Sequence, residues 1–170
     1  MSATGTRAVA ALRRAGIEHA VHSYVPAERE RARRDDRPAY GLDAAAALGI
    51  PSTMVGKTLV VVADGVLMLA VVPAHRTLDL KLFARAVGAR RAVMAEPHDA
   101  ERATGYRIGG ISPIGTTRPM RTVLDSGAAD LPAIHVSAGQ RGLQVSMLPA
   151  DLVRLVGAEV AKISSESTKL

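Results

Sequence analysis

The stretch KTLVVVADGVLMLAVVP, residues Lys57 to Pro73, contains two runs of aliphatic residues on either side of Asp64 and Gly65. An Asp-Gly pair between two apolar runs is typical of a tight β-hairpin turn, because both residues tolerate a positive φ. The stretch therefore predicts two antiparallel strands, with Lys57 at the start of the first.

Helical and strand patterns alternate on both sides of this hairpin. Before it, apolar spacing predicts a helix over 6–16, a strand over 18–25 and a short helix over 41–51. After it, we expect helices over 79–88, 96–105 and 149–158 and strands over 121–127, 133–139 and 143–148. This order predicts the α/β class, as one domain with a mixed sheet flanked by helices.

The chain of 170 residues shows no repeat and no linker between domains. We expect one domain over residues 1–163, followed by a disordered tail, SSESTKL, at 164–170. The segment 26–38 is charged, bounded by prolines and without apolar periodicity, which predicts a mobile surface loop.

Composition excludes several classes of chemistry. Cysteine is absent, so disulfides, thiolate metal sites and a cysteine nucleophile are excluded. No signal peptide or membrane span is visible, and we expect a soluble cytoplasmic protein. The net charge of +6 favours contact with polyanions such as nucleic acid. An arginine-rich solvated surface without a partner explains the same charge.

Lys57 stands beside a continuous aliphatic strand. Two interpretations stay open: a partly buried lysine with a lowered pKa, suited to bind a phosphate or carboxyl-derived oxygen, or a lysine that extends to solvent at the strand end. The sequence GKT resembles part of a phosphate-binding loop. No glycine precedes Gly56 by five residues, so the Walker pattern is missing.

The segment RIGGISPIG, residues 107–115, suits neither a helix nor a regular strand. Gly109 and Gly110 would let a ligand approach main-chain N–H groups, and Pro113 would stiffen the loop. Such a loop suits a carbonyl oxygen or an oxyanion, although a purely structural turn is the alternative. A hairpin turn explains most of the segment SAGQRG at 137–142. It does not account for Ser137, which stays a candidate site residue.

The histidines do not form a recognisable metal site. His19 and His22 fall on a predicted strand, where a spacing of three places them on opposite faces. No Gly-x-Ser-x-Gly elbow is present, and Ser112 is followed by a proline rather than a helix. A metal centre and a hydrolase triad are therefore not expected.

Four motifs occur in a characteristic order: VGKTLVVV, LDLKLFARAVGARRAVMA, ATGYRIGGISPIG and IHVSAGQRGLQVSM. Together they resemble the YbaK/EbsC group of aminoacyl-tRNA editing proteins, which are related to the editing domain of bacterial prolyl-tRNA synthetases. The resemblance runs from about Thr6 to Ile163. It implies a mixed, partly barrel-like sheet flanked by helices.

The resemblance also implies an enzyme that deacylates a misacylated tRNA, with Cys-tRNA(Pro) or a related misacylated tRNA(Pro) as substrate. The ester would be cleaved without metal or cofactor, by positioning and oxyanion stabilisation, with water or the substrate's own thiol as nucleophile. Implied catalytic residues are Lys57, Gly110, Ser112 and Ser137. Implied substrate-binding residues are Tyr24, Thr58, Gly109, Ile111, Pro113, Gly139, Arg141 and Gln144.

One position departs from the family pattern. Some members carry an acidic residue where this chain has Gln144, so the amino-acid preference does not transfer directly. Contact of residues 26–41 with RNA, and docking on prolyl-tRNA synthetase, are left open. The alternatives are a non-catalytic module that binds aminoacyl-tRNA or a synthetase, and a nucleotide-phosphate hydrolase, for which acidic metal ligands near the glycine loops are missing.

Overall fold

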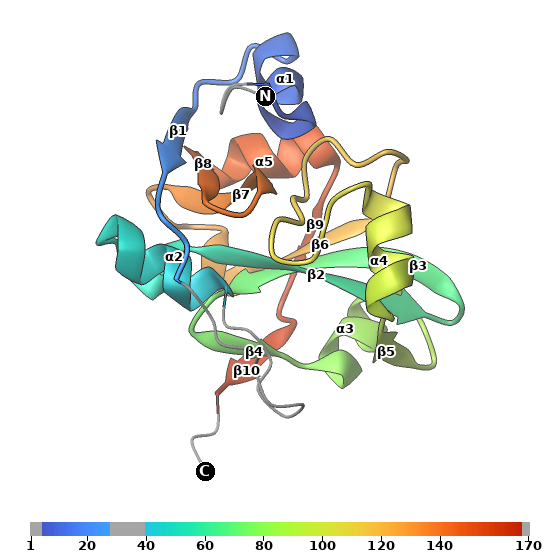
Figure 1. Cartoon of the computed structure of the whole chain (residues 1–170). Coiled ribbons are helices and arrows are strands. Elements are labelled where there is room, and N and C mark those ends of the chain that lie inside the picture. Colours follow the sequence, from blue (N-terminus) through green and yellow to red (C-terminus); the bar gives the residue numbers. More distant parts are fainter. Residues whose placement is uncertain (1–4, 28–39, 168–170) are drawn as a thin grey trace.

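The structure is a computed structural model that describes residues 5–27 and 40–167. The expected hairpin is confirmed as β2 (Gly56–Ala63) and β3 (Val66–Pro73), which pair along their whole length. Asp64 and Gly65 both adopt positive φ, 46° and 82°. A two-residue turn needs these angles so that its twist matches that of the strands it connects. This hairpin is the centre of the molecule (Figure 1).

A five-stranded sheet is built around the hairpin in the described part of the chain, in the order β5-β2-β3-β6-β9. β5 (Ala92–Met94) pairs antiparallel with β2, whereas β6 (Thr122–Asp125) and β9 (Glu159–Ala161) continue the sheet in parallel. The sheet is therefore mixed, as expected.

A second sheet has the order β1-β8-β7 and is antiparallel. Its strands are β1 (Ala20–Ser23), β8 (Leu143–Met147) and β7 (Ile134–Gln140). Alternate residues of β7 and β8 face one core, which they share with Val71 of β3 and Leu124 of β6. Two sheets thus enclose one core, and in this sense the arrangement is partly barrel-like. The helices α1 (Arg7–Arg14) and α5 (Pro149–Val156) cover this core.

Two helices cover opposite faces of the five-stranded sheet. α3 (Leu80–Val87), capped by Asp79 and ended by Gly88, packs Phe83 against Val61. α4 (Pro97–Thr104) packs Ala100 against Val60, the next residue of β2. Because side chains alternate along a strand, these neighbours define the two faces. α2 (Tyr40–Leu48) and the 3₁₀ helix Ser52–Met54 lead into β2.

The C-terminal segment corrects an expectation. Ser164–Glu166 is not disordered but forms β10, which pairs with β4 (Arg76–Leu78). Ser164 is buried and its Oγ accepts a hydrogen bond from Arg76 Nε at 2.8 Å. Strands of three residues are too short to show the apolar alternation that sequence patterns detect, so β9 and β10 escaped prediction. Residues 168–170 of the expected tail lie outside the described part.

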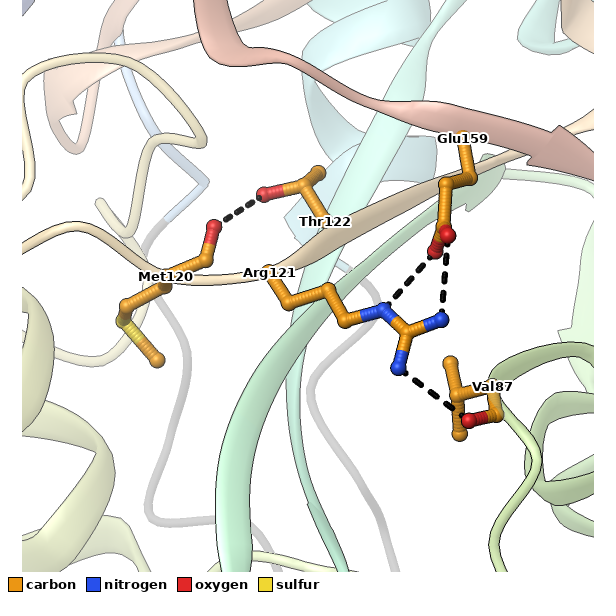
Figure 2. Close-up of polar contacts among 5 residues, drawn as sticks. All are labelled: Val87, Met120, Arg121, Thr122 and Glu159. Atoms are coloured by element: carbon orange, nitrogen blue, oxygen red, sulfur yellow. Dashed lines mark hydrogen bonds and ion pairs between the residues drawn. The ribbon is translucent and has the colours of Figure 1, made fainter.

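Figure 2 shows how one arginine joins three elements near the sheet edge. Arg121, at the entry to β6, donates to both carboxylate oxygens of Glu159 in β9, at 2.9 and 3.0 Å, and to the carbonyl of Val87 in α3 at 3.1 Å. The guanidinium holds the pKa of the Glu159 carboxyl below its ordinary value through this hydrogen bond. Both side chains are about half exposed, so the stabilisation is modest.

Most of the expected loop at 26–41 lies outside the described residues, which resume at Tyr40. In the parts that are described, each helix is too short or too polar to traverse a lipid bilayer.

Candidate functional site

The starts of β2 and β7 approach each other although they are far apart in sequence. A parallel bridge pairs Val55, just before β2, with His135 of β7. Continuing this parallel register by two residues would bring Lys57 level with Ser137. β2 and β7 themselves belong to different sheets.

Their side chains point to the same face. A Cβ built on Gly56 would lie 3.3 Å from side-chain atoms of Ile134 and of Val136, so the Gly56 position faces the core. Because side chains alternate, Lys57 and Ser137 both point to the opposite face. On β8, Gln144 pairs with Ser137 and shares this face.

The Lys57 side chain is half-buried, and burial lowers the pKa of its ammonium below the ordinary value. In the part of the chain that the structure describes, no carboxylate forms an ion pair with Lys57. A partly desolvated ammonium without a counter-ion attracts anionic or polar ligand atoms strongly. This environment favours the functional interpretation of Lys57 over that of a lysine extended into solvent.

The glycine loop is seated against the turn between β7 and β8. A Cβ on Gly110 would lie 2.9 Å from the backbone nitrogen of Arg141, so no larger residue fits there without displacing the turn. Gly109 has a φ of +93°, and the N–H of Gly110 donates to the Arg107 carbonyl at 2.9 Å. Among the described residues, no acceptor is present for the N–H groups of Gly109 and Ile111.

The start of α2 connects the loop with the lysine. A Cβ on Gly109 would lie 3.2 Å from the ring of Tyr40, and a Cβ on Gly41 would lie 3.6 Å from the Cβ of Lys57. Adjacent residues of one helix therefore contact the glycine loop and the lysine strand. Lys57 and the loop belong to one region of the molecule.

The remaining loop residues are held inside the protein. Ser112 is fully buried, and its Oγ accepts a hydrogen bond from the Ile114 N–H at 3.2 Å. Pro113 is also buried, and Ile111 packs against the cluster of Val60 on β2. The Oγ of Ser112 is thus engaged within the loop, and a catalytic role for this residue stays a prediction.

Two side chains clamp the carbonyl groups that follow the loop. The hydroxyl of Tyr106 donates to the carbonyls of Ile114 at 2.6 Å and Gly115 at 3.2 Å. Arg7 of α1 donates to the carbonyls of Gly115 at 3.0 Å and Thr104 at 3.3 Å, and its guanidinium lies 4.8 Å from the centre of the Tyr106 ring. Sequence reasoning missed this clamp, because nothing in the local sequence of α1 indicates its distant partners.

The turn residues form the opposite wall. The Ser137 Oγ accepts a hydrogen bond from the Gly139 N–H at 3.1 Å, which shapes the end of β7. Gly139, with a φ of +97°, lies directly against the ring of Tyr106. Gln144 is buried, and its Oε1 has no hydrogen-bond partner in the described structure.

Three further expected residues have different placements. Tyr24 directly follows β1, and its N–H donates to the Gly142 carbonyl at 2.9 Å, which fixes it beside the turn. Arg141 is exposed, with its guanidinium 5.4 Å from the centre of the Tyr40 ring. Thr58 follows Lys57 on β2 and therefore points to the other face. Its buried Oγ1 has no partner among the described residues.

A histidine pair on the Lys57 face was not anticipated. The rings of His22 on β1 and His135 on β7 are 5.1 Å apart, and His22 Nε2 lies 2.8 Å from the Oγ of Ser146. Burial and the neighbouring His22 lower the pKa of His135, whose Nδ1 has no partner in the described structure. The alternation of polar and apolar residues in β7 and β8 is the signal that could have predicted this polar sheet face.

In the described ranges, no three or more histidine, aspartate or glutamate side chains gather as metal ligands would. The atoms that the site offers to a ligand are an ammonium, main-chain N–H groups, and buried amide and imidazole acceptors. Such a set can bind and polarise an ester and stabilise the negative charge that develops on its carbonyl oxygen.

Solved structures and curated proteins resemble this chain. A crystal structure described as "a putative trans-editing enzyme for prolyl tRNA synthetase" superposes with a TM-score of 0.77 and 26% identity, covering 97% of this chain and 98% of the other. "Putative Cys-tRNA(Pro)/Cys-tRNA(Cys) deacylase EbsC" of Enterococcus faecalis is 38% identical over 123 residues, 72% of this chain and 75% of that protein.

A proline--tRNA ligase of Solidesulfovibrio magneticus is 32% identical over 113 residues, which are 60% of this chain and 20% of the ligase. Residues 39–155 match the family model described as the aminoacyl-tRNA editing domain. That match covers more than half of the chain and includes Lys57, the glycine loop and the β7–β8 turn. The chain therefore belongs to the aminoacyl-tRNA editing domain family and is an editing deacylase of misacylated tRNA.

Proposed function

We propose that this protein hydrolyses the ester of a misacylated tRNA(Pro), with Cys-tRNA(Pro) as the preferred substrate. The observation that carries the proposal is the arrangement of Lys57 and Ser137 on one face beside a glycine loop with two available N–H groups. The choice of cysteine and of the proline tRNA is supported by the names of the relatives described above.

The N–H groups of Gly109 and Ile111 receive the ester carbonyl oxygen. When a nucleophile adds to the carbonyl carbon, this oxygen becomes negatively charged, and donors fixed in advance stabilise it without reorganisation. The bond to the ribose oxygen then breaks, and that oxygen takes a proton and leaves as the 3′-hydroxyl of the RNA. Gly110 and the buried Ser112 hold the loop in the required conformation and act as positioning residues.

Lys57 anchors the ribose-phosphate end of the substrate, so that the ester lies beside the loop. Gln144 faces the amino acid as a neutral acceptor for its α-ammonium, in a place where some members of the family have a carboxylate. Ser137 and Tyr24 complete the wall of the pocket, at the end of β7 and after β1. The nucleophile is water, or the cysteine thiol of the substrate itself.

A deacylation panel tests this proposal directly. Proline tRNA charged with cysteine, alanine or serine is incubated with the enzyme, and the loss of aminoacyl ester is followed over time. We expect Cys-tRNA(Pro) to be cleaved fastest. Cleavage of the alanyl and seryl esters at a similar rate would show that water attacks, because neither substrate has a thiol.

The variant Lys57→Ala separates catalysis from binding alone. We expect the rate to fall by roughly 100-fold or more, as for the loss of one well-placed electrostatic group, while the exposed lysine variant Lys81→Ala keeps the parental rate. Binding of RNA by a wild-type protein that cleaves none of the three esters would instead favour a non-catalytic module. Stimulation by added prolyl-tRNA synthetase tests the second expected partner.

A further inference from the structure

A pocket of about 360 Å³ lies between the glycine loop and the β7–β8 turn. One side is formed by residues 105–108 and Gly110, and the other by Gly139, Gln140 and Arg141. The pocket is built where the loop packs against the β7–β8 turn, so its two walls are fixed to each other by the close approach of Gly110 to the turn backbone.

Among the described residues, the charged side chains that line this pocket are two arginines. Arg107 and Arg141 are exposed, and no carboxylate of residues 5–27 or 40–167 lines the pocket. Arg107 makes no side-chain hydrogen bond or ion pair with any described residue. The nearby carboxylate of Glu101 accepts a hydrogen bond from the N–H of Ile108 at 3.0 Å.

Arg141 is held in place while keeping donors available. One of its terminal nitrogens donates to the carbonyl of Ala27 at 2.7 Å, and the guanidinium lies over the ring of Tyr40. A guanidinium has five N–H donors, so several are left for an incoming anion. Fixing the side chain in advance also lowers the conformational entropy lost on binding.

A second pocket has a different electrostatic character. It has a volume of about 240 Å³, and its lining includes Arg102 and Arg118 together with the carboxylate of Asp99. A carboxylate inside a pocket repels phosphate, whereas an arginine pair without one attracts it, and guanidinium groups match phosphate oxygens in geometry. The larger pocket is therefore the better phosphate site.

We propose that the pocket between Arg107 and Arg141 binds a phosphodiester of the RNA 3′ end. This inference rests on the proposed function, in which the N–H groups of Gly109 and Ile111 hold the ester. Gly110, which lines the pocket, lies between these two donors. The glycine loop thus separates two compartments: the amino acid occupies the face of Ser137 and Gln144, and the RNA backbone leaves along the arginine side.

A comparison of two substrates tests the proposal. One is the misacylated tRNA, and the other is the 3′-O-aminoacyl ester of adenosine, which carries the same ester and no phosphate. For Arg107→Ala and Arg141→Lys, we expect the ratio of kcat/KM on tRNA to kcat/KM on the nucleoside ester to fall by about tenfold. The control Arg85→Ala removes an equal charge from α3, on the opposite face of the five-stranded sheet, and should leave the ratio unchanged.

An unchanged ratio in both pocket variants would overturn the proposal, and so would an equal fall in the Arg85→Ala control. Equal losses on both substrates would also overturn it, because the arginines would then act on the ester region and not on a phosphate.

Direct binding keeps this test independent of the reaction. The affinity for an uncharged CCA-ended tRNA minihelix is measured by fluorescence anisotropy at several salt concentrations. Loss of one phosphate contact in Arg107→Ala should lower the slope of log affinity against log salt by roughly 0.7. An unchanged slope would contradict the subsite. The slope could also differ between the parent and Arg107→Ala while the parent cleaves no ester. That outcome would contradict the proposed reaction while supporting the subsite.

Discussion

Lys57 illustrates a conflict between stability and function at a single residue. Its ammonium is partly removed from water and has no carboxylate partner in the described structure, and burial lowers its pKa. Keeping the charged form there costs free energy of folding. The cost is present at neutral pH and shrinks as the pH rises through the lowered pKa of the folded protein. It is gone above the ordinary lysine value of 10.5, where the unfolded chain has also lost the proton.

We therefore expect Lys57→Met to be inactive but more stable than the parent at neutral pH. A methionine keeps most of the aliphatic stem and removes the charge. A gain of about 1 kcal/mol would raise Tm by roughly 2–4 °C for a chain of this size. The measurement is thermal unfolding near pH 7 and near pH 10.5, where the difference should shrink. A lower Tm at neutral pH would contradict this account of Lys57.

His135 makes a second prediction at the residue scale. Burial and the neighbouring His22 lower its pKa. As the pH falls through the ordinary value of 6.5, the unfolded chain therefore takes up a proton at a higher pH than the folded protein does. Stability associated with neutral His135 is therefore complete above pH 6.5 and lost as the pH falls below it. In urea unfolding at about pH 7.5 and about pH 5.5, His135→Asn should lose less stability than the parent. Equal losses would show that His135 does not titrate in this way.

At the scale of elements, the clamp on the glycine loop determines how rigid the loop is. Arg7 belongs to α1, outside the segment 39–155 that matches the family model. Gly115 packs on the backbone of Arg7 and Ala8, where a Cβ would lie 2.8 Å from the nearest backbone atom. The first helix thus supports a loop about a hundred residues away in the sequence.

Tyr106→Phe should weaken catalysis through loop position. The change removes the hydroxyl that donates to the carbonyls of Ile114 and Gly115, and an unpaired buried carbonyl costs about 1–3 kcal/mol. We expect kcat to fall by about tenfold or more, with KM nearly unchanged and faster hydrogen exchange at Ile114. A normal kcat together with a lower Tm would mean that the clamp stabilises the fold alone.

The elements that the sequence predicted are those whose ends are marked by turn or cap residues in the local sequence. Asp64-Gly65 placed the central turn, and Asp79 and Gly88 placed both ends of α3, because caps and turns depend on a few adjacent residues. The strands β9 and β10 have three residues each, and they depend on partners far away in the chain. Their existence follows from tertiary pairing, which no local pattern contains.

At the scale of the whole molecule, the C-terminal segment connects β6 of the five-stranded sheet with β4 of the two-stranded sheet. The N–H of Ile163 donates to the buried carboxylate of Asp125 at 3.0 Å, and β10 then pairs with β4. Ser167 Oγ donates to the His75 carbonyl at 3.0 Å. The domain therefore extends beyond residue 163, where the sequence suggested its end.

Truncation tests this boundary. A chain that ends at residue 163 loses the hydrogen bonds of β10 and of Ser164, each contributing about 0.5–1.5 kcal/mol. We expect its Tm to fall by roughly 5–10 °C, whereas a chain that ends at residue 167 should unfold like the full-length protein. Thermal unfolding of the three chains decides the matter. Equal Tm values for the chains ending at 163 and 167 would show that β10 adds no stability.

The composition of the site stays a prediction from the motifs, which pointed to Lys57, the glycine loop and Ser137. Its construction is visible only in the structure, where α2 contacts both the loop and the start of β2. The opposite orientation of Thr58, the internal hydrogen bond of Ser112 and the histidine pair all depend on which face of a strand or loop is covered. That information arises only when the two sheets pack against each other.

The parallel bridge between Val55 and His135 spans about half of the chain. A nascent polypeptide that has emerged as far as residue 115 already contains the lysine and the glycines, yet nothing encloses its second side. Editing competence therefore arrives late during synthesis, after the hairpin of β7 and β8 has left the ribosome. During refolding, recovery of activity should lag behind recovery of helical circular dichroism, because the site needs contacts between distant segments whereas helices form from local ones.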